Sequence, residues 1–228
     1  NNVDYKVQLP FLKNFLPNFN NLIKLQNHKI LINYKKNELN IKGKGNFSIK
    51  GVEDYFDYKL SQDNNGYKFD TFFNIEKNQF LIDALNYKKN TDLKASLKLK
   101  GIYKKNKQVK FNTILFTDEE KSQLLINGLN LDKKFKISNI ISLKFDFINN
   151  DKITNQIELK NEKDFYKING KSFDATKIIE NILDNNDESN SIFSNNFNSN
   201  IDIKINKTYL DNITFVNNLN GIINIKDN

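Results

Sequence analysis

Apolar residues recur at every second position through most of the chain, which is the pattern of β-strands with one buried and one solvated face. Phe69, Thr71, Phe73 and Ile75, for example, alternate strictly with polar residues. Short polar turns, such as the Asn-Gly turn at residues 63–66, separate these stretches. The pattern predicts about fourteen strands, and their connections are too short for crossovers. We therefore expect a mostly β fold, a long antiparallel meander.

The alternation changes to helical spacing at one place. Asp174 can cap a helix, and Ile178, Ile179, Ile182 and Leu183 follow it at intervals of one, three and four residues. This pattern predicts one short amphipathic helix near residues 174–184.

Two further stretches depart from the strand pattern. Residues 10–25 carry apolar residues at helical spacing, but Pro17 interrupts them, so we expect one or two short helical turns. Residues 186–199 are rich in Asn and Ser and predict a polar loop around Ile192, Phe193 and Phe197. We expect residues 1–228 to form a single segment, a sheet curved into a groove, as explained below. The polar loop is a weak internal boundary within this segment.

One short helix can cover only a small part of the apolar face that so many strands create. Such a face requires a second sheet, closure of the sheet on itself, or a ligand. A β-sandwich with a dry core fits the alternation, although the spacing lacks a long Greek-key return. A sheet curved into an open trough, with its inner face covered by acyl chains, fits the same alternation. The candidate residues for lining such a groove are Ile30, Ile32, Phe56, Tyr58, Phe69, Phe73, Leu97, Leu99, Phe111, Leu115, Leu143, Phe145, Ile157 and Leu159.

The net charge of +8 suggests an anionic partner, but the residue choice argues against nucleic acid. All 35 basic residues are Lys, acidic residues lie among them, and Arg is absent, so bidentate contacts with guanine or phosphate are not possible. We interpret the lysines as a solvated polar face. The abundance of Asn, Lys, Ile and Phe reflects A/T-rich codons.

Candidate catalytic and metal-binding residues are few. The chain contains no Cys, so it has neither disulfides nor thiolate ligands, and His28 is the only histidine. The acidic runs at residues 118–120 and 184–188 lack the spacing of a calcium loop. No serine lies in a Gly-x-Ser-x-Gly elbow, and no Gly-rich phosphate loop is present. We expect no enzymatic activity, no cofactor and no metal site.

The C-terminal part of the chain resembles a known family. Residues 168–174 read Ile-Asn-Gly-Lys-Ser-Phe-Asp and lead into the expected helix, and the hydrophobic-Asp-hydrophobic stretches at residues 201–205 and 210–213 follow the polar loop. This order over residues 135–226 resembles the AsmA-like bacterial envelope proteins, especially the YhdP and TamB branches. The resemblance implies a β-groove that spans the periplasm from an inner-membrane anchor and carries phospholipid towards the outer membrane.

From this resemblance we expect a segment of a longer protein in a Gram-negative bacterium. Its partners would be phospholipid acyl chains, a membrane contacted through other parts of the protein, and envelope proteins that the sequence does not identify. Two alternatives remain open. One is a non-catalytic scaffold, a β-sandwich or solenoid segment of an envelope or surface protein. The other is a bridge-like lipid transporter from an A/T-rich eukaryotic parasite.

Overall fold

The computed structural model describes residues 3–6, 15–36, 38–64, 66–89, 91–104, 108–184, 193–194 and 197–225. Strands account for most of these residues. The elements are β1 (Val3–Lys6), β2 (Leu22–Lys35), β3 (Glu38–Ile49), β4 (Val52–Asp63), β5 (Gly66–Ile75), β6 (Phe80–Ile82), the 3-10 helix η2 (Asp83–Leu85), β7 (Tyr87–Lys89), β8 (Ala95–Lys104), β9 (Val109–Asp118), β10 (Gln123–Leu131), β11 (Ile137–Asn139), β12 (Ser142–Ile148), β13 (Thr154–Asn161), β14 (Phe165–Asp174), α1 (Thr176–Asp184), β15 (Ser199–Tyr209) and β16 (Phe215–Ile225).

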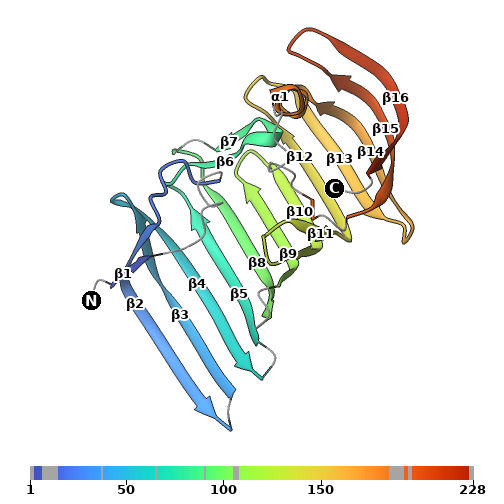
Figure 1. Ribbon diagram of the computed structural model, residues 1–228. Coiled ribbons are helices and arrows are strands. Elements are labelled where there is room, and N and C mark those ends of the chain that lie inside the picture. The colour runs from blue at the N-terminus through green and yellow to red at the C-terminus, as the bar shows by residue number, and fades with distance from the viewer. Residues whose placement is uncertain are drawn as a thin grey trace.

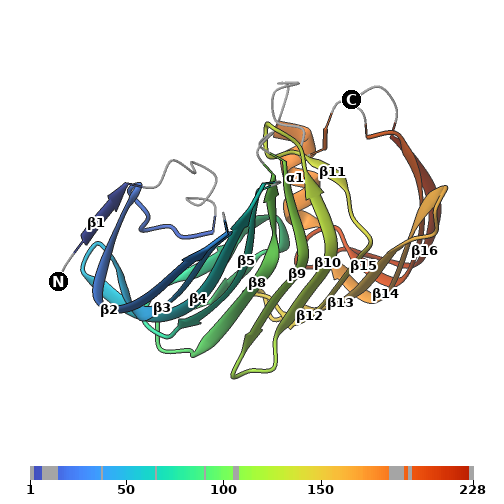
Figure 2. The ribbon, with the colours of Figure 1, turned by 90° about the horizontal axis from the view of Figure 1, so that it is seen from below.

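One fourteen-stranded sheet forms the body of the protein. Its strands follow the chain from β1 to β16, except that β6 and β7 form a small separate sheet and β11 lies beside the main order, paired with β10. The sheet curves along its length into an open trough (Figures 1 and 2). In the hydrogen-bonded order β1 and β16 lie at opposite ends, so the sheet does not close through its described strands. The expected mostly β, largely antiparallel trough with one short helix is confirmed.

The strand order contains one crossover that the short connections did not predict. β14 and β15 are parallel, and α1 lies between them in the chain. The helix begins where expected, because the Oδ1 atom of Asp174 accepts a hydrogen bond from the Thr176 amide at 3.0 Å. Asp174 is buried, and the side-chain amide of Asn149 donates to its Oδ2 atom.

In the described residues 15–25, the structure has a turn and the start of β2 in place of the helical turns expected over residues 10–25. Leu22 and Leu25 belong to β2, where they pair with β1. In the described residues just before β2, a turn is closed by the Phe19 amide, which donates to the Leu16 carbonyl at 2.9 Å. Residues 10–14 lie outside the described residues. Pairing with neighbouring strands has overridden the helical spacing here.

The alternation also predicts strands whose bounds differ in the structure. Residues 79–87 read as one strand but hold β6, η2 and the start of β7, because Asn86 takes a left-handed conformation with a φ of 49°. Residues 135–148 read as one strand but hold two, β11 and β12, and residues 200–225 read as three short strands but hold the two longer strands β15 and β16. Within the described part of the chain, no helix is long and apolar enough to cross a membrane.

Candidate functional site

Apolar side chains lie in register across the sheet and form rows on one of its faces. The central row runs through directly opposed residues of consecutive strands, namely Phe56, Phe73, Leu97, Phe116, Leu124, Phe145 and Ile157. We call the face that carries this row the inner face, because the segments packed against it lie inside the trough (Figure 2). The opposite face is the outer face.

The inner face holds all but one of the predicted groove residues. A second row contains Ile30, Tyr58, Leu99, Leu143 and Leu159, and a third contains Ile32, Phe69 and Phe111. Together with the central row, these rows place the predicted residues on one continuous surface.

Leu115 is the exception, because it lies on the outer face opposite Lys98. The pairing of β8 with β9 shifts between Lys100 and Gly101, which leaves Asn112 as an extra residue in β9. This bulge turns Ile114 and Phe116, in place of Leu115, towards the inner face. The sequence did not predict this reversal, nor the inner-face positions of Ile41 and Leu60, which stand in register with Ile32.

The middle of the inner face is covered by protein. Phe116 is only 1% exposed, and Phe145 and Ile157 are also buried. The cover is the excursion between β5 and β8, which carries β6, η2 and β7. Phe80 of this excursion stacks on Phe116 with ring centroids 4.8 Å apart, and Tyr87 meets Phe116 edge-on at 5.5 Å. This part of the trough is a packed hydrophobic core.

Buried polar groups hold the excursion in place. Asp54 of β4 accepts hydrogen bonds at 2.9 Å from the backbone amides of Glu76, Lys77 and Asn78. The fully buried Lys89 donates to the carbonyl oxygens of Glu76 and Asn78. Burial lowers the pKa of the Lys89 ammonium, and the nearby Asp54 carboxylate opposes that shift. The excursion is therefore a fixed part of the fold.

Tyr87 provides a further attachment for the excursion. Its hydroxyl donates to the Asp118 carboxylate at 2.6 Å. Burial first, and this hydrogen bond second, raise the pKa of the Tyr87 phenol above its ordinary value. Asp118 also accepts from the Ser122 amide, so the acidic run at residues 118–120 is a structural turn.

The part of the trough near β14 has a second cover. Phe197 is buried, stacks on Tyr166 with centroids 5.5 Å apart, and stacks on Phe193 at 4.4 Å. Ile140 and Leu129 complete this cluster. Two aromatic residues of the expected polar loop, Phe193 and Phe197, are thus part of a hydrophobic core, whereas Ile192 lies outside the described residues.

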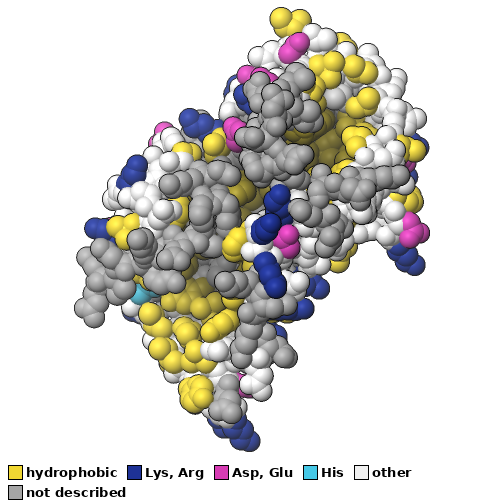
Figure 3. All heavy atoms as spheres, in the orientation of Figure 1, with side chains coloured by type: hydrophobic (Ala, Val, Ile, Leu, Met, Phe, Trp, Pro, Cys, Tyr) yellow, Lys and Arg dark blue, Asp and Glu magenta, His cyan; other side chains and the backbone are white. Residues whose placement is uncertain are grey.

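Phe19 packs with Phe47 and Ile49 of β3 in a buried cluster, and the inner face of β2 to β5 is open beyond this cluster. Figure 3 shows hydrophobic side chains gathered there, at the lower left of the molecule. Ile30 is 53%, Ile32 63% and Tyr34 67% exposed. We call this surface the open basin; its residues are Ile30, Ile32, Tyr34, Ile41, Tyr58, Leu60 and Phe69. At about 4.8 Å per strand it spans about 15 Å across the sheet.

The open basin is both smooth and uncharged. Three rows cross the basin from β2 to β5. They are Ile30–Gly43–Tyr58–Thr71, Ile32–Ile41–Leu60–Phe69 and Tyr34–Leu39–Gln62–Tyr67. None of these residues carries a charge at neutral pH. The Tyr58 ring lies against Gly43, at a place where a Cβ atom would clash with it. Burial raises the pKa of the Tyr58 phenol, as expected for a group surrounded by apolar side chains.

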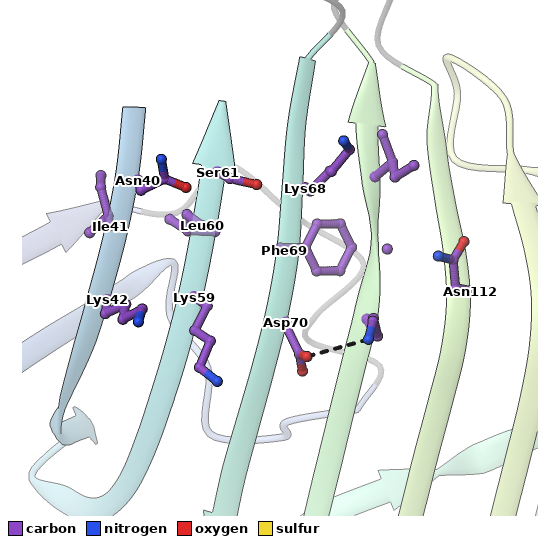
Figure 4. Close-up of a pocket in the computed structure, with 13 residues that line it drawn as sticks. Asn40, Ile41, Lys42, Lys59, Leu60, Ser61, Lys68, Phe69, Asp70 and Asn112 are labelled. Atoms are coloured by element: carbon purple, nitrogen blue, oxygen red, sulfur yellow. Dashed lines mark ion pairs between the residues drawn. The ribbon is translucent and has the colours of Figure 1, made fainter. Parts of the chain in front are cut away.

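The outer face has a different character. Two shallow depressions, of about 380 and 500 Å³, are lined by its lysines and by backbone between them. Figure 4 shows the first, in which Lys42, Lys59, Lys68 and Asp70 come from neighbouring strands. Asp70 forms an ion pair with Lys100 at 3.7 Å.

The described residues contain no cluster of potential metal ligands. His28 lies over Gly45 and beside Phe56, and its Nε2 atom is 3.0 Å from the Asn46 carbonyl oxygen. No group of three or more His, Asp or Glu side chains that could hold a metal ion occurs in the described ranges. The chain matches no protein-family model, no curated protein and no solved structure. The apolar inner face is therefore the candidate functional site.

Proposed function

We propose that this chain is part of a lipid-transfer protein and that the open basin shields the acyl chains of phospholipids. The observation that carries this proposal is the exposure of Ile30, Ile32 and Tyr34 on the inner face of a curved sheet. Soluble proteins rarely leave such a contiguous apolar surface uncovered unless it binds something.

The chemistry of the open basin favours acyl chains over other apolar ligands. Its rows contain aliphatic and aromatic side chains and no charge, so they offer burial without a fixed orientation. Each methylene group removed from water contributes about 0.8 kcal/mol. Because the basin is open along β2, the charged headgroup of a bound phospholipid stays in solvent.

The covered middle changes how lipid would move. Phe80 and Tyr87 occupy the space above Phe116, so an acyl chain does not slide along one uninterrupted inner face. In our proposal the open basin holds lipid on the N-terminal side of the excursion, and headgroups pass outside it. This activity involves no covalent chemistry and no cofactor.

The cellular setting of the proposal comes from the resemblance to AsmA-like proteins. In this setting the chain is the periplasmic part of an inner-membrane-anchored protein of a Gram-negative bacterium, and it contributes to outer-membrane biogenesis by carrying phospholipid. The membrane anchor and any docking proteins belong to other parts of the system.

Native mass spectrometry tests the proposal. The chain is expressed in bacteria, purified without detergent, and its bound lipids are extracted and identified. We expect mass increments that match phospholipids. Ile32→Asn should reduce them, whereas Ile222→Asn should not, because Ile222 is similarly exposed at 68% but lies on the outer face of β16. A wild-type protein that carries no lipid and binds none when lipid is added would contradict the proposal.

A scaffold segment with a dry core is the second candidate. The packed cluster around Phe116, Phe145 and Ile157 favours it, because that part of the inner face needs no ligand. This alternative predicts a lipid-free protein whose stability is unchanged by detergent.

A further inference from the structure

Lysines stand directly opposite one another on the outer face of β2 to β4. Lys29 of β2 pairs with Lys44 of β3, and Lys42 of β3 pairs with Lys59 of β4. Like charges directly opposed across two strands destabilise a sheet. All four side chains are exposed, so the sheet presents this charge to its surroundings.

The three outer-face rows around these pairs extend from β2 to β9 and remain strongly basic. Asp57 and Asp70 are their only described carboxylates. The lysines of these rows are Lys29, Lys42, Lys44, Lys59, Lys68, Lys98, Lys100 and Lys110. We call these lysines the lysine field. Much of the net charge of +8 is thus concentrated on one face of one half of the sheet.

The other half of the outer face is balanced. Lys144 of β12 stands opposite Glu158 of β13, and Lys167 of β14 stands opposite Asp202 of β15. Lys160 and Lys167 do face each other, but Lys160 also forms an ion pair with Glu158 at 3.1 Å. A general preference for lysine on exposed strands therefore does not account for the difference between the two halves.

Large apolar side chains are exposed on the same face, beside the lysines of the lysine field. Leu31 is 67%, Tyr55 37% and Phe72 38% exposed, and Leu31 and Phe72 stand in register with lysines of the field. Surfaces that bind the boundary between headgroups and acyl chains combine lysines with such apolar side chains. The two shallow depressions described above lie between the same lysines.

We propose that the outer face of β2 to β9 docks on an anionic membrane surface, with the lysine field contacting phospholipid headgroups. Lysine acts as a point charge that suits the laterally mobile headgroups of a membrane, whereas nucleic acid recognition favours the arginine that this chain lacks. This surface is opposite the open basin, so the inference does not depend on the proposed function.

Vesicle flotation tests the inference. The probes are vesicles of phosphatidylcholine alone and vesicles in which phosphatidylglycerol is mixed with phosphatidylcholine. We expect binding only to the anionic vesicles, and we expect it to weaken as salt is raised. The double variant Lys42→Gln and Lys59→Gln should bind about twentyfold more weakly, since each lysine near such a surface contributes roughly a fivefold factor.

The control variant carries Lys160→Gln and Lys167→Gln. It removes the same charge from another directly opposed lysine pair on the same face, outside the lysine field. We expect its vesicle binding to stay within about twofold of the unaltered protein. Both variants should keep the melting temperature of the unaltered protein, or exceed it for the first variant, because a repulsive pair is removed. Equal loss in both variants, or equal binding to neutral and anionic vesicles, would overturn the inference.

Discussion

The Oδ2 atom of Asp54 accepts two hydrogen bonds from Asn78, one from its backbone amide and one from its side-chain amide, both at 2.9 Å. The two residues are 24 positions apart, and both are buried. Their contact joins β4 to the first turn of the excursion that covers the inner face. This contact anchors the start of the excursion beside the inner face.

Asp54→Asn should therefore destabilise the protein by about 3 kcal/mol, because buried amides lose charged acceptors and the Lys89 ammonium loses a nearby carboxylate. Urea denaturation measures the change. Asp57→Asn is the control, since Asp57 lies on the outer face of the same strand, and it should change stability by less than about 1 kcal/mol. Similar losses in both variants would show that Asp54 does not fix the excursion.

The addition of a methyl group should change the stability of the protein in opposite directions at two glycines of the inner face. At Gly101 a Cβ atom would clash with the Lys110 carbonyl oxygen and the Phe69 ring, whereas at Gly221 it would meet nothing within 4 Å. Gly101→Ala should cost about 1–3 kcal/mol. Gly221→Ala should be neutral or stabilise the fold by up to about 1 kcal/mol. Thermal unfolding of the two variants provides the comparison.

The raised pKa of Tyr87 predicts a loss of stability in alkaline solution. Above a pH of about 10 the tyrosine of the unfolded chain ionises while the buried phenol remains protonated, so the unfolded state is favoured. Tyr87→Phe should lower stability by about 1 kcal/mol at neutral pH, because the hydrogen bond to Asp118 is lost. The difference between the two proteins should shrink as the pH rises above 10. A difference that stays constant up to strongly alkaline pH would contradict the assignment.

Truncating a side chain should cost more stability in the covered middle of the inner face than in the open basin. Phe145 is 5% exposed within the covered middle, so Phe145→Ala should cost about 3–5 kcal/mol. Ile32 is 63% exposed, and Ile32→Ala should cost about 1 kcal/mol or less. Denaturant unfolding in the absence of lipid measures both values. A loss at Ile32 as large as that at Phe145 would mean that the basin is packed against protein.

The spacing of apolar residues was sufficient to predict the class of fold and the helix after Asp174, whereas the alternation fitted a β-sandwich as well as the open trough. Strand alternation has a period of two, so it identifies faces wherever the strand is regular. It does not reveal bulges. Counting in twos from Phe111 placed Leu115 in the groove, but the extra residue Asn112 reverses the faces of the remaining strand.

The covered middle could not be predicted from the alternation either. Phe80 and Tyr87 lie in a stretch that reads as one more strand, and only the left-handed conformation of Asn86 folds it back over Phe116. The partners of Asp54 are similarly remote in sequence. Non-local contacts of this kind decide which of the predicted groove residues are accessible, and the sequence carries no local signal for them.

Photo-crosslinking in bacterial cells tests the central claim most directly. A benzoylphenylalanine is placed at the position of Ile32, on the inner face, or at the position of Ile222, which is similarly exposed on the outer face but lies outside the lysine field, and the crosslinked products are identified by mass spectrometry. We predict phospholipid adducts through acyl-chain carbons at position 32 and not at position 222. Adducts of equal yield at both positions, or no lipid adduct at position 32, would contradict the conclusion that the open basin holds acyl chains.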